Sequence, residues 1–255
     1  MTIFKEITGQ GEDVVVIHGG GVSHKDMRPV AAELAKHYRV TNIDLPGTGS
    51  STWDDAIHTI HDMADYVVKE LPSKAIYVGW SFGGLVCQSI AARYPRRVKR
   101  FVGIGASPKF IATEGWIGVP QPGFTPIFFS ILQAGKGAKD LLKIVYEYEF
   151  ENIHPKPSIY REGEKLWNGP SSISNELLFK RIEICDATDL RQEFKYIHCP
   201  IDLIMGDQDE NVPKIAWKNI NALNPHVKIH EISGARHAPF WTHPQEFNEI
   251  LKRIL

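Results

Sequence analysis

The sequence predicts an α/β fold in which helices cover both faces of a mostly parallel central sheet, with one helical insertion. Short, nearly continuous apolar runs alternate with segments of helical spacing. This pattern is typical of a parallel sheet whose strands are buried on both faces and are connected by helices. One such run, 75–78, reverses into a helical segment through a turn rich in glycine. A stretch rich in proline and aromatic residues, 108–186, interrupts the alternation and predicts the insertion.

The composition is that of one globular domain. The chain has 255 residues, 43% of them hydrophobic and 23% charged, and a formal net charge of -1. This balance disfavours recruitment to nucleic acid or to a membrane, and no apolar run is long enough for a signal peptide or a membrane span. We expect a cytoplasmic monomer. Three widely spaced cysteines argue against a disulfide framework or a zinc site, and we expect no metal and no cofactor.

The first hundred residues follow the alternation in order. Strands are predicted at 3–7, 14–17, 39–43, 75–78 and 100–104, and helices at 26–37, 57–71 and from 85 to about 94. His58 and His61 lie one turn apart on the second helix, but no cluster of carboxylates or cysteines completes a metal site. We interpret them as part of a solvated helix face.

The turn Gly79-Trp80-Ser81-Phe82-Gly83 is the most informative stretch. A strand that reverses into a helix within five residues strains the central backbone position and requires small neighbours, which the glycines supply. Ser81 is then exposed at the tip, and the N–H of Phe82 can donate to a developing oxyanion. The turn resembles the nucleophile elbow of the α/β hydrolases. A glycine-rich turn that contains a serine by chance is the alternative.

A second turn, His18-Gly19-Gly20-Gly21, follows the strand at 14–17. Because a turn after a central strand can aim a backbone N–H at a reacting oxygen, we predict Gly20 as the second oxyanion donor beside Phe82. We interpret His18 as a structural residue of this turn. Asp44 opens a loop of turn residues, 44–51, and is predicted to fix that loop through hydrogen bonds to backbone N–H groups.

The remaining chain divides into a lid and the rest of the core. Residues 108–186 are predicted to form a mostly helical lid over the site, whereas 1–107 and 187–255 form the α/β core. Within the core, strands are predicted at 201–205 and 227–233, a helix from about Lys214 and a last helix near Pro244.

The ends of the two late strands supply partners for Ser81. Asp207 and Asp209 follow the first and His237 follows the second, and the carboxyl ends of parallel strands converge on one crevice. The order Ser, Asp, His is that of the α/β-hydrolase triad, with His237 as general base. We choose Asp209 as the acid because Asp207 would hydrogen-bond within its own turn; Asp207 stays the alternative. His243 is the rival base.

Three stretches carry a closer resemblance: residues 79–86, Asp189-Leu190-Arg191-Gln192, and His237-Ala238-Pro239-Phe240 with His243-Pro244. They resemble the pimeloyl-[acyl-carrier protein] methyl ester esterases of biotin synthesis. The resemblance implies hydrolysis of the methyl ester of pimeloyl-acyl-carrier protein, with acyl-carrier protein as partner. The sequence departs from the family pattern at Gly20, where a bulky aromatic residue is common.

In that family the lid meets the carrier protein through basic residues and touches the acyl chain through an adjoining segment. Here the resemblance implies docking by Lys139, Lys143, Lys156 and Arg161 and acyl contacts by Ile144, Val145, Tyr146, Glu147 and Tyr148, beside Gly20, Ser81, Phe82 and His237. A solvated helix face is the alternative for the lysines, since Asp140, Glu147, Glu149 and Glu151 lie among them.

Two other functions stay open. A carboxylesterase for short soluble esters would use the same three residues. A ligand receptor can also keep the fold and the triad while turning over negligibly.

Overall fold

The computed structural model describes residues 2–255 and has one sheet of seven strands at its centre. The strands are β1 (Lys5–Thr8), β2 (Asp13–Ile17), β3 (Arg39–Ile43), β4 (Ala75–Trp80), β5 (Val98–Ile104), β6 (Ile201–Gly206) and β7 (Val227–Ile232). Their order is β1-β3-β2-β4-β5-β6-β7, and only β1 runs antiparallel to its neighbour. The predicted α/β class with a mostly parallel sheet is therefore confirmed.

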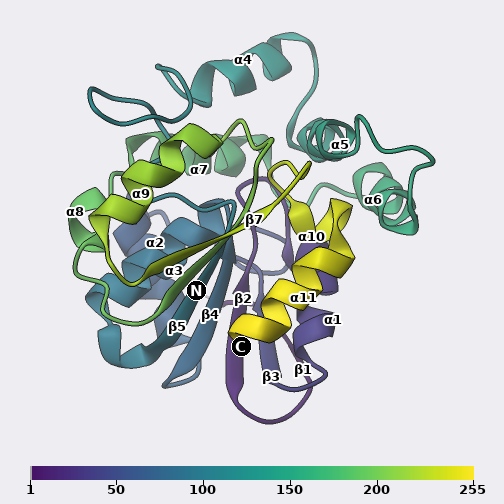
Figure 1. The fold of residues 1–255 in the computed structure, drawn as a ribbon. Helices are drawn as coiled ribbons and strands as arrows, with labels where there is room; N and C mark the ends of the chain where they lie inside the picture. The colour runs from purple at the N-terminus through teal and green to yellow at the C-terminus, as the bar shows by residue number, and fades with distance from the viewer. Residues whose placement is uncertain (1) are drawn as a thin grey trace.

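Helices cover both faces of the sheet (Figure 1). On one side lie α1 (Arg28–Leu34), α10 (Pro239–Thr242) and α11 (Pro244–Ile254), and on the other α2 (Ile60–Lys69), α3 (Phe82–Arg93), α8 (Arg191–Phe194) and α9 (Trp217–Leu223). Above one end of the sheet are α4 (Thr125–Gln133), α5 (Ala138–Glu149), α6 (Ser158–Asn168) and α7 (Asn175–Ala187).

The alternation of side chains along the strands builds a separate core on each face. In β4, Tyr77 points into the core under α2 and α3, whereas Ile76, Val78 and Trp80 point into the core under α1, α10 and α11. Every residue of β4 and of β6 is buried. The residues at the carboxyl ends of these two strands are thus held on a rigid base.

Several predicted boundaries shift, and capping residues explain most of the shifts. The helix expected at 26–37 is a short 3-10 helix, His24–Met27, followed by α1, because Ser23 and Asp26 form a capping box and Pro29 lies at the start of α1. The helix expected at 57–71 begins at Ile60, where Thr59 and Asp62 form a second capping box. The first strand lies at Lys5–Thr8 instead of 3–7.

We call residues 108–186 the lid. It begins with a loop that holds two isolated bridges, and α4 to α7 follow. Phe128, Ala138, Ile173 and Leu178 form a small hydrophobic cluster of their own, apart from both cores of the sheet. Within residues 2–255, no helix combines the length and the apolar character needed to cross a membrane.

Candidate active site

Ser81 lies between β4 and α3 in a strained conformation. Its φ of 54° and ψ of -118° lie in a region that L-residues rarely adopt. The glycines on either side allow this turn: a Cβ on Gly79 would lie 2.5 Å from the carbonyl oxygen of Gly83, and one on Gly83 would lie 2.4 Å from that of Ile17. The Ser81 N–H donates to the carbonyl oxygen of Ile104 at 2.9 Å. Strand, turn and helix therefore hold Ser81 in one place.

His237 and Asp209 meet beside this turn. The Nδ1 of His237 lies 2.8 Å from the Oδ2 of Asp209, and the two residues are only 6% and 2% exposed. The other oxygen of Asp209 accepts the backbone N–H groups of Asn211 and Val212. Asp207 instead accepts the N–H of Gly234, which lies in the turn after β7 and not in the turn of Asp207 itself. The structure thus brings Asp209, and not Asp207, to His237.

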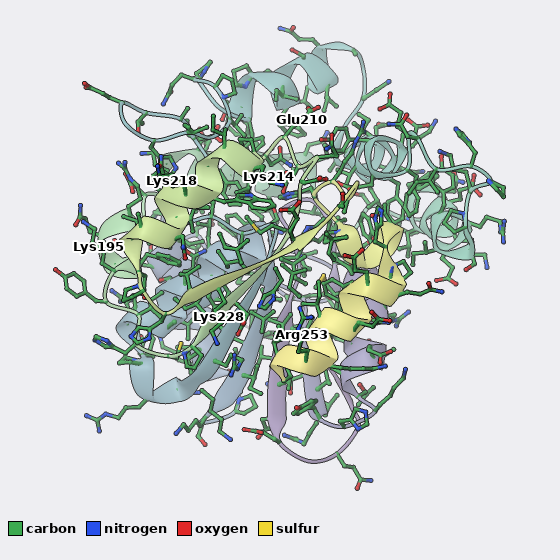
Figure 2. All side chains as sticks on the ribbon, viewed as in Figure 1. Lys195, Glu210, Lys214, Lys218, Lys228 and Arg253 are labelled. Atoms are coloured by element: carbon green, nitrogen blue, oxygen red, sulfur yellow. The ribbon has the colours of Figure 1, made fainter. Side chains whose placement is uncertain are left out.

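The loop that carries Asp209 lies at the carboxyl end of β6, below the lid. Glu210, the next residue, is labelled in Figure 2 at the upper end of the sheet, on the side of α5. Both aspartates follow the same strand, but only Asp209 turns inward.

The electrostatics of His237 depend on its partner. Burial would lower the pKa of His237, but the charge of Asp209 and the hydrogen bond to it, together with the charge of Glu149, raise it above its ordinary value. The indole Nε1 of Trp80 donates to the carbonyl oxygen of His237 at 2.9 Å. His243 lies beside Thr242 and does not line the cavity described next.

A cavity of about 200 Å³ opens above Ser81. Its walls are mostly apolar side chains of the lid, namely Phe124, Ile127, Phe128, Ile131, Leu141, Val145, Leu178 and Ile182. Several residues of the predicted site also line this cavity, namely Gly20, Ser81, Phe82, Tyr148 and His237. The shape and polarity suit an acyl chain whose carbonyl carbon lies at Ser81.

Only part of the segment 144–148 reaches this cavity. Val145 and Tyr148 line it, whereas Ile144, Tyr146 and Glu147 do not. Tyr146 faces the core instead, and its ring stacks on Trp241 at a centroid distance of 4.2 Å. Residues three apart on a helix share a face, so a helix cannot present five consecutive side chains to one cavity.

Gly20 and Phe82, the two residues expected to supply oxyanion donors, both line the cavity. Phe82 is the first residue of α3, so its N–H has no partner within the helix. Gly20 lies next to Phe82, and a Cβ on Gly20 would be 3.7 Å from the Cβ of Phe82 and would meet no other atom within 4 Å beyond the adjoining residues. The absence of a side chain at Gly20 therefore leaves space in the cavity.

Arg181 of the lid helix α7 holds the Gly20 loop. It is 1% exposed and donates to the carbonyl oxygens of Gly20 at 3.0 Å and of Pro46 at 2.6 Å. Burial lowers its pKa to about 9, so the guanidinium stays charged at neutral pH. Arg181 thus links the lid to the loops after β2 and β3.

His18 and Asp44 are both predicted to be structural, and both make hydrogen bonds within the turns and loops around them. The Nδ1 of His18 lies 2.7 Å from the carbonyl oxygen of Gly19, and its Nε2 accepts the N–H of Leu45. Burial lowers the pKa of His18 to about 3 and keeps it neutral. Asp44 accepts the N–H groups of Ser50 and His24, which confirms that it fixes its loop.

Glu149 corrects one interpretation. The sequence grouped it with the solvated acids of the lid, but it is 4% exposed and lines the cavity. Its carboxylate accepts the N–H of Ala238 at 2.9 Å, next to His237. Spacing could have found it, because Leu142, Tyr146 and Glu149 form the buried stripe of α5. No local signal marks Arg181 in the same way.

The four residues expected to dock a carrier protein lie on α5, on α6 and in the segment between them. Lys139 and Lys143 are exposed, and Lys143 lies 3.6 Å from Glu147. Lys156 is bound to the carbonyl oxygen of Phe150, and Arg161 donates to that of Lys156. Within residues 2–255, no group of three or more His, Cys, Asp and Glu side chains is arranged to hold a metal ion.

Comparisons with known proteins agree with this fold. A family model described as the alpha/beta hydrolase fold matches residues 13–244. The chain is 29% identical over 254 residues to the pimeloyl-[acyl-carrier protein] methyl ester esterase of Vibrio cholerae serotype O1, covering 98% of this chain and 97% of that protein. The resemblance expected from the motifs is therefore confirmed across nearly the whole chain.

Solved structures share the fold. An esterase from Exiguobacterium antarcticum superposes with a TM-score of 0.85 at 19% identity, covering 99% of this chain and 94% of that one. The enol-lactonase of Burkholderia xenovorans LB400 gives 0.81 at 20% identity, with 98% and 95% covered. At identities of 19% and 20%, these two comparisons show a shared fold and nothing further.

Proposed function

The chain belongs to the α/β-hydrolase fold family, and on this premise we propose that it is a serine carboxylesterase that acts through Ser81, His237 and Asp209. The observation that carries the proposal is the buried contact of 2.8 Å between His237 and Asp209, at a cavity that Ser81 also lines. A nucleophile, a base and a group that orients the base are the elements of covalent acyl transfer.

The mechanism assigns each group a step. The Oγ of Ser81 attacks the ester carbonyl carbon while the Nε2 of His237 takes its proton, and the N–H groups of Gly20 and Phe82 stabilise the oxyanion. Collapse of this intermediate expels the alcohol, which takes the proton from His237 and leaves an acyl-enzyme. Water then attacks with His237 as base, and the carboxylic acid is released. Asp209 fixes the tautomer of His237 and stabilises its charged form.

We propose that the substrate is the methyl ester of pimeloyl-acyl-carrier protein, and that methanol is the alcohol released in this step of biotin synthesis. The name of the Vibrio cholerae relative and the apolar cavity of the lid support this choice. The reaction would then take place in the cytoplasm. We propose Lys139 and Lys143 as the main contacts of the carrier protein, because Lys156 and Arg161 are bonded to backbone carbonyl oxygens.

The test compares two substrates and uses Ser81→Ala as the blank. Ser81-dependent release of methanol from pimeloyl-acyl-carrier protein methyl ester, at a kcat/KM well above that for a short aryl ester, is the expected result. Hydrolysis of the aryl ester alone would leave a general carboxylesterase. Stoichiometric binding of a small ligand without turnover would indicate a receptor.

The docking lysines have a matched control. Lys139→Glu with Lys143→Glu is expected to raise KM for the carrier-bound ester about tenfold and to leave the aryl ester unaffected, since charge complementarity acts on association. Lys218→Glu is the control: Lys218 is an exposed lysine of α9, which Figure 2 shows at the left, far from α5. Equal effects of both changes would contradict docking at the lid.

A further inference from the structure

Glu149 is a buried acid that the proposed mechanism does not use. It ends the lid helix α5, is 4% exposed, and lines the cavity that contains Ser81 and His237. Its Oε2 accepts the N–H of Ala238, the residue after the base, at 2.9 Å. A lid residue therefore contacts the loop of the catalytic histidine directly.

The contact belongs to a larger attachment between α5 and this loop. Arg236, the residue before His237, donates to the carbonyl oxygen of Tyr148, and its guanidinium lies 4.3 Å from the centre of the Tyr148 ring. The same guanidinium pairs with Glu151 at 2.6 Å. The end of α5 and the residues just after it thus contact both neighbours of His237, Arg236 through its side chain and Ala238 through its backbone.

We propose that Glu149 is a positioning residue for the base: it fixes the His237 loop from the lid and supplies a second negative charge, beside that of Asp209, which stabilises the protonated imidazole. The inference rests on the triad of the proposed function. It assigns to the lid a part in the chemistry as well as in the enclosure of substrate.

The hydrogen bond to Ala238 does not by itself explain why residue 149 is an acid. A glutamine would accept the N–H of Ala238 equally well and would not place a carboxylate in an apolar cavity, where ionisation is costly. A carboxylate at this place stabilises His237 in its charged form, which arises when the base takes the proton of Ser81.

The surrounding charges agree with this role. His237 and Arg236 face Glu149 from the loop after β7, Asp209 faces it from the loop after β6, and Tyr148 is its neighbour on α5. Burial raises the pKa of Glu149 to about 7, against the opposing effects of His237 and of the N–H of Ala238. The two groups are therefore coupled, because the charge of each one acts on the ionisation of the other.

The test is the pH profile of kcat/KM for Glu149→Gln with a short aryl ester, which does not involve the carrier protein. Without the charge, the pKa of His237 falls. We expect the midpoint of the acidic limb to move about 0.5 to 1 pH unit lower, and the plateau at high pH to fall about threefold to tenfold because the base is weaker. Well below the midpoint of the acidic limb, the two effects offset each other and the two proteins become nearly equal.

Glu151→Gln is the matched control. It lies near the same helix end and bonds the same loop through Arg236, but its side chain is 63% exposed and does not line the cavity. We expect the midpoint of its acidic limb to match that of the unaltered protein, even if loss of the bond to Arg236 lowers the plateau. A direct titration of the His237 imidazole by nuclear magnetic resonance should show the same downward shift in Glu149→Gln.

The outcomes separate the inference from the proposed function. If Glu149→Gln keeps the midpoint and loses activity equally at every pH, Glu149 is only structural and the inference is wrong. If Ser81→Ala retains the aryl esterase activity, the triad itself fails and with it the basis of this inference.

Discussion

Trp80 and His237 are joined by a hydrogen bond of 2.9 Å from the indole N–H to the backbone carbonyl oxygen. The residue before Ser81 therefore bonds the backbone of His237 and links the two loops that carry the proposed nucleophile and base. The indole also packs edge-on against Phe240 and Trp241 at centroid distances of 5.2 and 4.9 Å.

Trp80→Phe removes the hydrogen bond and keeps a smaller aromatic ring in the same place. The carbonyl oxygen of His237 loses its partner in a buried place, which costs about 1 to 3 kcal/mol of the free energy of unfolding. We expect kcat to fall more than KM rises, because the base loses its position. Denaturant unfolding and steady-state kinetics measure both, and an unchanged kcat would show that this bond only stabilises the fold.

Ser81→Ala and Ser81→Gly should both be inactive but should differ in stability. Each removes the nucleophile, so activity should fall at least about 10³-fold. Glycine relieves the strain of the positive φ and alanine does not, so Ser81→Gly should be more stable than Ser81→Ala by about 1 kcal/mol. Thermal unfolding of the pair measures this difference, and equal stabilities would mean that the turn carries no strain.

Asp209→Asn and Asp207→Asn test which acid orients the base. We expect kcat to fall about 10³- to 10⁴-fold for Asp209→Asn, because the amide favours the wrong tautomer of His237. Asp207→Asn should change kcat by less than about threefold, since Asp207 accepts the N–H of Gly234 and does not contact His237. The reverse ranking in steady-state assays would make Asp207 the catalytic acid.

Arg181→Met should weaken both the fold and the oxyanion hole. The carbonyl oxygens of Gly20 and Pro46 lose their buried donor, and we expect a loss of about 2 to 4 kcal/mol in the free energy of unfolding. A transition-state analogue should bind more weakly, because the Gly20 N–H is no longer held in place. Lys180→Met, at the adjacent and more exposed position, is the control; equal losses would exclude a specific role.

The stability of the protein should depend on pH through Glu149. Its pKa is about 7 in the folded protein, above the ordinary value of 4.5. A raised pKa means that its contribution to stability is present below pH 4.5 and is lost as pH rises through 7.

The unfolding of Glu149→Gln measures this contribution. Relative to the unaltered protein, the variant should gain about 3 kcal/mol in the free energy of unfolding between pH 4 and pH 8, because glutamine cannot ionise. A difference in the free energy of unfolding that stays constant with pH would show that folding does not raise the pKa of Glu149.

Sequence predicted the parts of the site that depend on local patterns. The elbow of Ser81 follows from its glycines. Asp209 meets His237 as the sequence predicts, although Asp207 bonds the turn after β7 and not its own turn. Their positions are determined by short stretches of chain, whose conformation the residue types limit.

The contributions of the lid could not be predicted in the same way. Arg181 and Glu149 look like surface charges in the sequence, and they are buried because the lid packs against loops far away in the chain. For the same reason Tyr146, which was expected to touch the acyl chain, packs on Trp241 instead. Such partners are set by tertiary contacts and not by local propensity.

The separate cluster of Phe128, Ala138, Ile173 and Leu178 gives the lid its own internal support. Ile127 and Ile131 of α4 line the cavity and are not members of either core of the sheet. If the proposed function holds, substitutions at these two positions can therefore change the length of acyl chain that the cavity accepts, by natural drift or by directed evolution, without altering the scaffold that holds Ser81.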